Sequence, residues 1–218
     1  MNPNTMKSSR LLVLYFSLLA VALGQTTIVN YTFENTTTAV VGSSISSISW
    51  DSGATASYSA AFASQNQALS IGSMANGNSF QVTLDASGLE NIIFNGFRIN
   101  GTSASPATWQ LAYSLTGAAG TFTPVSSYTL SSGASVGATT LSGFNLPAGA
   151  NNNSSVVISF LATTATKITG TGSASGTLHL DNLSFNATAV PEPSTYVLFL
   201  GLIALAGALI RRNSVARV

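Results

Sequence analysis

The chain has 218 residues, and its seven basic and six acidic side chains make up only 6% of them, against about 25% in an ordinary soluble domain. It contains no cysteine, which excludes disulfide bonds and thiolate metal sites. Residues 25–190 hold two basic and five acidic residues, a net charge of −3, so they lack the basic surface that nucleic-acid binding needs. The apolar, near-neutral composition also argues against disorder, which goes with low hydrophobicity and high net charge.

The N-terminus has the three parts of a secretory signal peptide. A basic start is followed by a run of 13 largely apolar residues at 11–23, and the small residues Ala22 and Gly24 precede Gln25. We expect residues 1–24 to be removed between Gly24 and Gln25 after export by Sec-type machinery. The alternative is an uncleaved anchor, although 13 residues are short for a span of about 20.

From residue 25 onward, apolar residues recur at every second position, which predicts half-buried β-strands. Segment 57–69 also fits a helix, with Tyr58 and Phe62 four residues apart, but its Ser and Asn content favours a strand and a loop. Strands are expected at 28–33, 57–62, 68–71, 80–84, 92–100, 109–115, 128–130, 139–144, 156–162 and 178–185.

Short strands separated by turn-forming clusters, without helical periods, predict an all-β fold, an antiparallel β-sandwich of jelly-roll type over residues 25–189. Leu180 and Leu183 lie on opposite parities of the last strand, which predicts a bulge at Asp181-Asn182. The inward-facing positions predict a core of Phe33, Phe80, Val82, Leu84, Phe94, Trp109, Leu111, Tyr113, Val156, Ile158, Phe160, Leu178 and Leu180.

Catalytic residue types are scarce in this domain. His179 is the only histidine, so a Ser-His-Asp triad would need it, and its outward position on a strand predicts an ordinary surface side chain. Asp85 and Glu90 are the closest pair of acids for a glycosidase, yet the sequence Asp-Ala-Ser-Gly at 85–88 is typical of a turn. We therefore expect no enzyme, and a glycoside hydrolase is the least favoured alternative.

Three aromatic residues lie outside the clearest alternating strands. Trp50, Tyr58 and Tyr128 are candidates for platforms on which sugar rings stack. The competing interpretation is that they close the ends of the sandwich as packing residues.

The C-terminus combines a proline-rich segment, an apolar run and a basic tail. Pro191 and Pro193 disfavour a helix before the run, so an extended segment is expected there. The 15 residues at 196–210 form a short span of about 22 Å as a helix, and Arg211 and Arg212 predict a cytoplasmic end in the inner membrane. The predicted region is 190–218, with a motif at 191–193, a transmembrane helix at 195–210 and a basic tail at 211–218.

This order of elements resembles the PEP-CTERM sorting signal of Gram-negative, matrix-producing bacteria. The matching residues are Pro191, Glu192, Pro193 and the small follower Ser194, ahead of the apolar run and the arginine pair. The resemblance implies processing by exosortase, a membrane cysteine protease, and delivery to the cell surface or exopolysaccharide matrix. A plain C-terminal anchor with an accidental Pro-Glu-Pro is the alternative.

The body opens with a strand that ends in YTFEN at 31–35, continues with WQLAYSLTGAAGTFTPV at 109–125 and closes with LHLDNLSF at 178–185. This running order is similar to that of lectin-like or carbohydrate-binding-module-like jelly rolls. In such domains the opening strand's acidic residue and the closing strand's Asp can hold a structural calcium ion. The matching positions are Glu34 and Asp181, whose oxygens suit a hard cation. Two surface carboxylates or turn caps are the alternative, and no other cofactor is expected.

Taken together, these features predict an exported, non-enzymatic protein with a structural or adhesive role at the cell surface or in the exopolysaccharide matrix. The alternative is a module that binds a matrix polysaccharide. The expected partners are the export machinery, an exosortase-like protease and an exopolysaccharide, with no nucleic acid.

Overall fold

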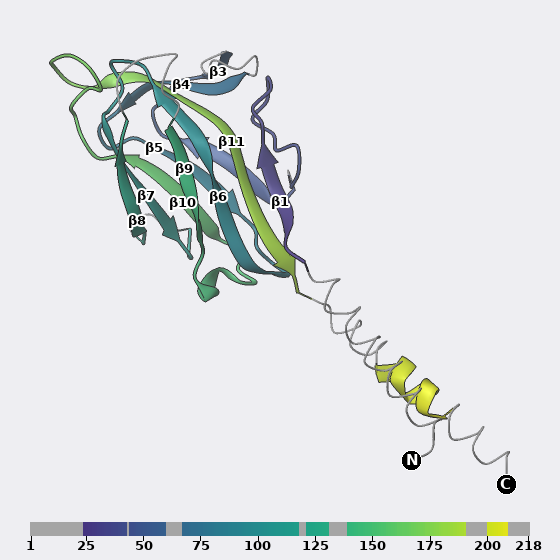
Figure 1. Cartoon of the computed structure of the whole chain (residues 1–218). Helices are drawn as coiled ribbons and strands as arrows, with labels where there is room; N and C mark the ends of the chain where they lie inside the picture. Colours follow the sequence, from purple (N-terminus) through teal and green to yellow (C-terminus); the bar gives the residue numbers. More distant parts are fainter. Residues whose placement is uncertain are drawn as a thin grey trace, which may run out of the picture.

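The computed structural model of this chain describes residues 24–42, 44–59, 67–117, 121–130, 139–190 and 200–208. Residues 200–208 form a helix. The remaining elements run in the order β1 (Thr26–Tyr31), β2 (Ser46–Trp50), β3 (Ala56–Ser59), β4 (Ala68–Ala75), β5 (Ser79–Leu84), β6 (Leu89–Gly101), β7 (Thr108–Ser114), β8 (Thr123–Thr129), β9 (Thr139–Asn145), the 3-10 helix η1 (Ala148–Ala150), β10 (Val156–Ala162) and β11 (Ser175–Ala189) (Figure 1).

The strands form two antiparallel sheets that face each other, as the alternation predicts (Figure 1). One sheet has the order β3-β4-β11-β6-β9, and β1 also pairs with β11; the other has the order β2-β5-β10-β7-β8. Each of the ten predicted strands is present at least in part, whereas β2 was not predicted. Residues 60–62 of the strand expected at 57–62 lie outside the described residues. The antiparallel sandwich is therefore confirmed.

The core lies between the sheets and is built from the inward positions of both. Large aromatic side chains occupy its centre, with the rings of Phe97 and Phe160 4.4 Å apart and those of Phe94 and Phe185 5.1 Å apart. Every residue of the predicted core is buried except Tyr113, which is half-buried and packs against the core. Burial of these side chains supplies the main stabilisation, because about 25 cal/mol is gained per Å² of apolar surface removed from water.

The predicted bulge in the last strand is confirmed. The register between β11 and β6 shifts between Asp181 and Ser184, and Asn182 has a φ of 57°. The extra residue changes the parity of the strand, so that Leu180 before it and Leu183 after it are both fully buried.

Two glycines lie where the backbones of the paired strands β6 and β9 approach closely. A Cβ atom on Gly143 would overlap the carbonyl oxygen of Phe94, and one on Gly96 would overlap that of Leu141. Both positions therefore require glycine, since backbone atoms on each side leave no room for a side chain.

Within the described residues, no helix is long and apolar enough to cross a membrane.

The close approach of β6 and β9 predicts that Gly143→Ala lowers the free energy of unfolding by about 3 kcal/mol, because the new methyl group must displace backbone. Gly72→Ala on β4 is the matched control, since its Cβ would meet only the Ala54 side chain at 3.7 Å. Chemical denaturation of both variants measures the difference. Equal stability of the two variants would contradict this close approach of the paired strands β6 and β9.

Candidate functional site

The two carboxylates predicted to share a cation come from opposite ends of the chain. Glu34 follows β1 in a tight turn, in which Phe33 and Asn35 have φ values of 54° and 59°. One oxygen of Glu34, Oε2, accepts a hydrogen bond from the backbone N–H of Gln67 at 3.2 Å. The turn thus ties the end of β1 to the start of β4.

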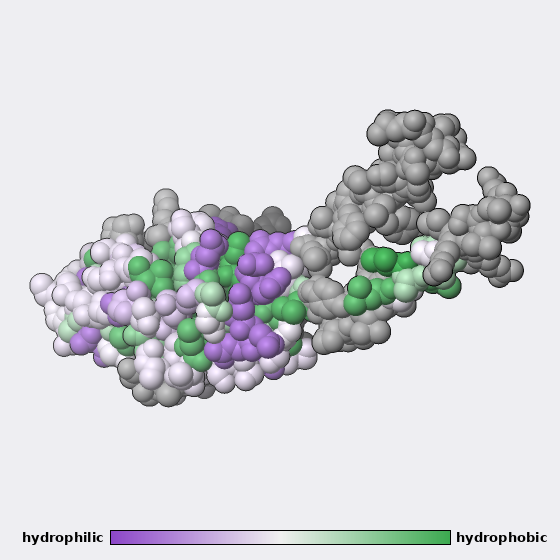
Figure 2. Space-filling view, turned by 90° about the horizontal axis from the view of Figure 1, so that it is seen from below, coloured by the Kyte–Doolittle hydropathy of each residue, from purple (hydrophilic) through white to green (hydrophobic). Residues whose placement is uncertain are grey.

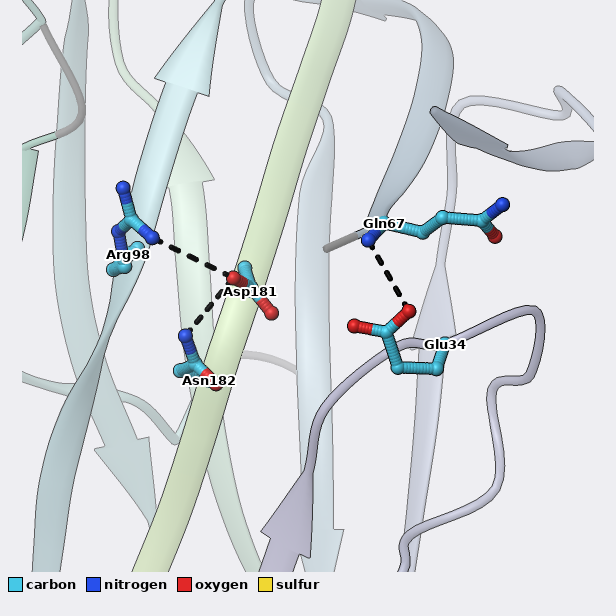
Figure 3. A network of polar contacts seen from close by, with 5 residues as sticks. All are labelled: Glu34, Gln67, Arg98, Asp181 and Asn182. Carbon is cyan, nitrogen blue, oxygen red and sulfur yellow. Dashed lines mark hydrogen bonds and ion pairs between the residues drawn. The ribbon is translucent and has the colours of Figure 1, made fainter. Parts of the chain in front are cut away.

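Asp181 sits at the bulge of β11, on the outward side of its sheet, and is only 1% exposed. Its Oδ2 accepts a hydrogen bond from Asn182 Nδ2 at 2.9 Å and lies 3.8 Å from Arg98 Nη1. Its Oδ1 is buried and has no hydrogen-bond partner within the part of the chain that the structure describes. Figure 3 shows Oδ1 pointing toward the Glu34 carboxylate, whereas the side chain of Gln67 turns away.

The electrostatics of Asp181 follow from this position. Burial raises the pKa of Asp181, a hydrogen bond from the backbone of Asn182 and the charge of Arg98 lower it, and the negative charge of Glu34 raises it again. Asp181 and Glu34 are therefore close enough to repel each other. Anything positive placed between them would relieve both the repulsion and the unpaired oxygen.

These residues fit a hard, oxygen-seeking cation such as calcium, because an orphaned buried carboxylate oxygen faces a second carboxylate. The described residues contain no group of three or more His, Cys, Asp or Glu side chains that could hold a metal ion. Glu34 and Asp181 would therefore need backbone carbonyls or water to complete the ligand set. Sequence reasoning missed Arg98 and Gln67, because only the strand register places them here.

The three aromatic candidates lie at the edges of the core. Trp50 on β2 faces Phe80, and its Nε1 donates a hydrogen bond to the carbonyl of Ala54 at 2.8 Å. Tyr58 on β3 and Tyr128 on β8 also pack against the core. Burial raises the pKa of Tyr128. A role of these residues in ligand binding stays a prediction.

His179 belongs to a polar row that crosses three strands. Its Nδ1 lies 2.8 Å from the hydroxyl of Ser70, which in turn lies 2.7 Å from the hydroxyl of Ser59. Burial lowers the pKa of His179 and so favours its neutral form. Ser70 is only 3% exposed, so its hydroxyl is poorly placed to attack a substrate.

The pair of acids considered for glycoside hydrolysis lies in a turn and at the start of β6. Asp85 Oδ1 accepts a hydrogen bond from the backbone N–H of Ser87 at 3.0 Å, which confirms the predicted turn. Hydrogen bonds from Ser87 lower the pKa of Asp85. Such a carboxylate stays ionised and is unsuited to act as a general acid.

The structure describes both residues of the predicted signal cleavage site, and Gly24 and Gln25 are exposed ahead of β1. The sorting motif Pro191, Glu192, Pro193 and Ser194 and the arginines Arg211 and Arg212 lie outside the described residues. Strand β11 ends at Ala189, two residues before Pro191. The backbone N–H of Val190 donates a hydrogen bond to the carbonyl of Gly88 at 2.8 Å.

Residues 189–213 match the PEP-CTERM protein-sorting motif, so the chain carries this motif. The motif implies export and exosortase-dependent sorting toward the cell surface. No curated protein matches the chain in sequence.

The body is similar to solved structures that include carbohydrate-binding modules and an adhesin domain. The CBM22-1-CBM22-2 tandem domain from Paenibacillus barcinonensis Xyn10C matches with a TM-score of 0.50 and 16% identity, over 78% of this chain and 48% of that one. The CBM22-1 xylan-binding domain from the same protein gives a TM-score of 0.48 and 13% identity, over 78% of this chain and 99% of that one. The K1 cleaved adhesin domain of Lys-gingipain from Porphyromonas gingivalis W83 gives a TM-score of 0.44 and 13% identity, over 74% of this chain and 97% of that one. The match to the tandem domain agrees with the predicted jelly-roll body, and at 16% identity it shows a likeness of fold alone.

We propose that Glu34 and Asp181 hold a structural calcium ion. A free calcium concentration about 100 times the Kd is then expected to raise the melting temperature of residues 25–190 by about 5 °C. Differential scanning calorimetry with calcium and with chelator measures this shift.

Glu34→Gln and Asp181→Asn should each abolish the shift. Asp85→Asn is the matched control and should keep it, because Asp85 lies in a turn away from Glu34 and an asparagine can form the same turn. An unchanged melting temperature of the wild-type protein in excess calcium and in chelator would sink the proposal.

Proposed function

We propose that this chain is an exported, non-enzymatic protein of the cell surface or the exopolysaccharide matrix, where the body has a structural or adhesive role. The observation that carries the proposal is the PEP-CTERM motif at residues 189–213, which begins where the last strand of the body ends. In this proposal the signal peptide directs export through Sec-type machinery, and an exosortase-like protease removes the C-terminal span from a transient inner-membrane form.

The surface of the body supports a role in a hydrated matrix. Hydroxyl and amide groups bond to one another across the outer face of the sheet that contains β11, as where Asn95 Nδ2 donates to Ser184 Oγ at 3.2 Å and to Asn186 Oδ1 at 3.0 Å. On the other sheet, the outward positions of adjacent strands pair exposed Ser49 with half-buried Gln81. Such uncharged groups exchange hydrogen bonds readily with polysaccharide hydroxyls and water.

The alternative function is binding of a matrix polysaccharide, which the likeness in fold to carbohydrate-binding modules favours. Trp50, Tyr58 and Tyr128 are the candidate platforms. A glycan array probed with residues 25–190 tests this alternative. Binding that is lost in Trp50→Ala or Tyr128→Ala, with the melting transition retained, would favour it over a purely structural role, whereas hydrolysis of any polysaccharide would overturn a non-enzymatic function.

The sorting proposal predicts that the mature protein from its own host lacks residues 196–218, because cleavage near the motif separates the body from the apolar run. Intact-mass analysis of the native protein measures this directly.

The double variant Pro191→Ala, Pro193→Ala should accumulate with its C-terminus uncut, since its segment is no longer held extended. Pro124→Ala, in exposed β8, is the matched control and should be processed as the wild type. A mature wild-type protein that still carries residues 196–218 would contradict processing by exosortase and indicate a simply anchored protein.

A further inference from the structure

Both junctions of the body lie against one turn. At the N-terminal junction, Gln25 Nε2 donates a hydrogen bond to the carbonyl of Asn91 at 2.7 Å. At the C-terminal junction, Val190 donates its N–H to the carbonyl of Gly88 at 2.8 Å. Thr26 pairs with Ala187, so β1 begins where β11 ends, at the same end of the sandwich (Figure 1). Residues 85–91 follow the end of β5 and include the start of β6, and we call them the junction turn.

A run of asparagines fastens the junction turn to the loop before β10. Asn152 Oδ1 accepts a hydrogen bond from the N–H of Gly88 at 2.8 Å, and Asn151 Oδ1 accepts one from the N–H of Asn91 at 3.1 Å. The N–H of Asn152 donates to the carbonyl of Leu89 at 2.8 Å. The loop and the turn therefore form one braced surface, and we call residues 85–91, 149–155 and 188–190 the junction pole.

The tether between this pole and the predicted membrane span is short. Only residues 191–195 separate Val190 from the apolar run at 196–210. Five extended residues reach at most about 18 Å. Because the headgroup region beyond the hydrocarbon core is itself about 6 Å thick on each side, the junction pole must lie close to the membrane while the span is in place.

The charge of the junction pole distinguishes between two candidate neighbours at the membrane, anionic lipid and another protein. Its charged side chains are Asp85 and Glu90, and no Lys or Arg belongs to it; the basic residues among the described parts of the body are Arg98 and Lys167. Figure 2, which views the molecule from below Figure 1, shows hydrophilic residues gathered on this face of the body, with apolar residues between them. Anionic lipid attracts basic clusters, so this acidic and amide-rich surface suits a protein neighbour better than lipid.

We propose that the junction pole is the surface by which the body docks on the membrane-embedded protease that processes the sorting motif. The proposal rests on the sorting function proposed above. The bond between Val190 and Gly88 fixes the point at which the chain leaves the body. Docking of the braced pole then presents residues 191–195 to the protease from a constant position, which raises their effective concentration at the active site.

The test uses the full chain in its own host, with the loss of residues 196–218 followed after pulse labelling. A 12-residue Gly-Ser linker between Val190 and Pro191 frees the cleavage segment from the pole and is expected to slow processing about ten-fold. The matched control has the same linker between Gly170 and Thr171, in the exposed loop before β11 at the opposite end, and should be processed at the wild-type rate.

A second pair of variants tests the surface itself. Ser154→Arg places a bulky cation on an exposed position of the pole and should slow processing about ten-fold by obstructing the contact, whereas Thr171→Arg at the far end should not. The linker lies outside the folded body, so it tests the proposal even if Ser154→Arg is unstable. Wild-type or faster processing of the linker variant would overturn the docking proposal alone. Failure of the wild-type chain to be processed at all would overturn the sorting function as well.

Discussion

Backbone pairing along β11 is the interaction on which the rest of the structure depends, because the last strand of the body lies in the middle of its sheet. On one edge it pairs with β6 from Leu178 to Ala189. The other edge is shared, with β4 beside the first part of the strand and β1 beside the second. The body can therefore close only after residues 175–189 have been exported, and those residues lead directly into the sorting motif. Closure of the fold and presentation of the signal are consequences of the same strand.

The bulge at Asp181-Asn182 lies where the shared edge changes partner. It keeps both halves of β11 facing the core, and it leaves the Asp181 carboxylate buried on the outer side of the sheet, beside Arg98. A single extra residue thus produces both the continuous core and the polar site with the orphaned oxygen. The same strand ends at the junction pole, where the N–H of Val190 donates a hydrogen bond to the carbonyl of Gly88. The continuous core, the polar site and the junction pole therefore all depend on β11.

A body with so few charges needs other means to protect its exposed strand edges. β8 is an edge strand that is exposed along almost all of its length. It contains Pro124, which offers no N–H to a neighbouring chain, and the register shifts beside it, between Leu111 and Ala112 of β7. Proline and a bulge therefore take the place that lysine usually has. The low share of charged residues, 6% of the chain, thus corresponds to a surface of hydroxyls and amides.

Much of the fold could be predicted from sequence, because alternation is strong wherever a strand faces the core on one side. Strand β2 was missed since only Ile48 and Trp50 alternate within a serine-rich stretch, too few to distinguish it from a loop. The neighbours of the candidate site could not be predicted, because the register that pairs Asp181 with Arg98 is set by contacts across the whole sheet. Sequence alone placed the aromatic candidates outside the clearest alternating strands, whereas in the structure Trp50 and Tyr128 occupy inward positions opposite Phe80 and Trp109.

Hydrogen exchange of the full chain, followed by mass spectrometry, tests most directly whether β11 closes the fold. The account predicts that amides from Leu178 to Ala187 are among the slowest to exchange and open only with global unfolding, as slowly as those of β10. Faster exchange of these amides than of those in the exposed edge strand β8 would contradict it.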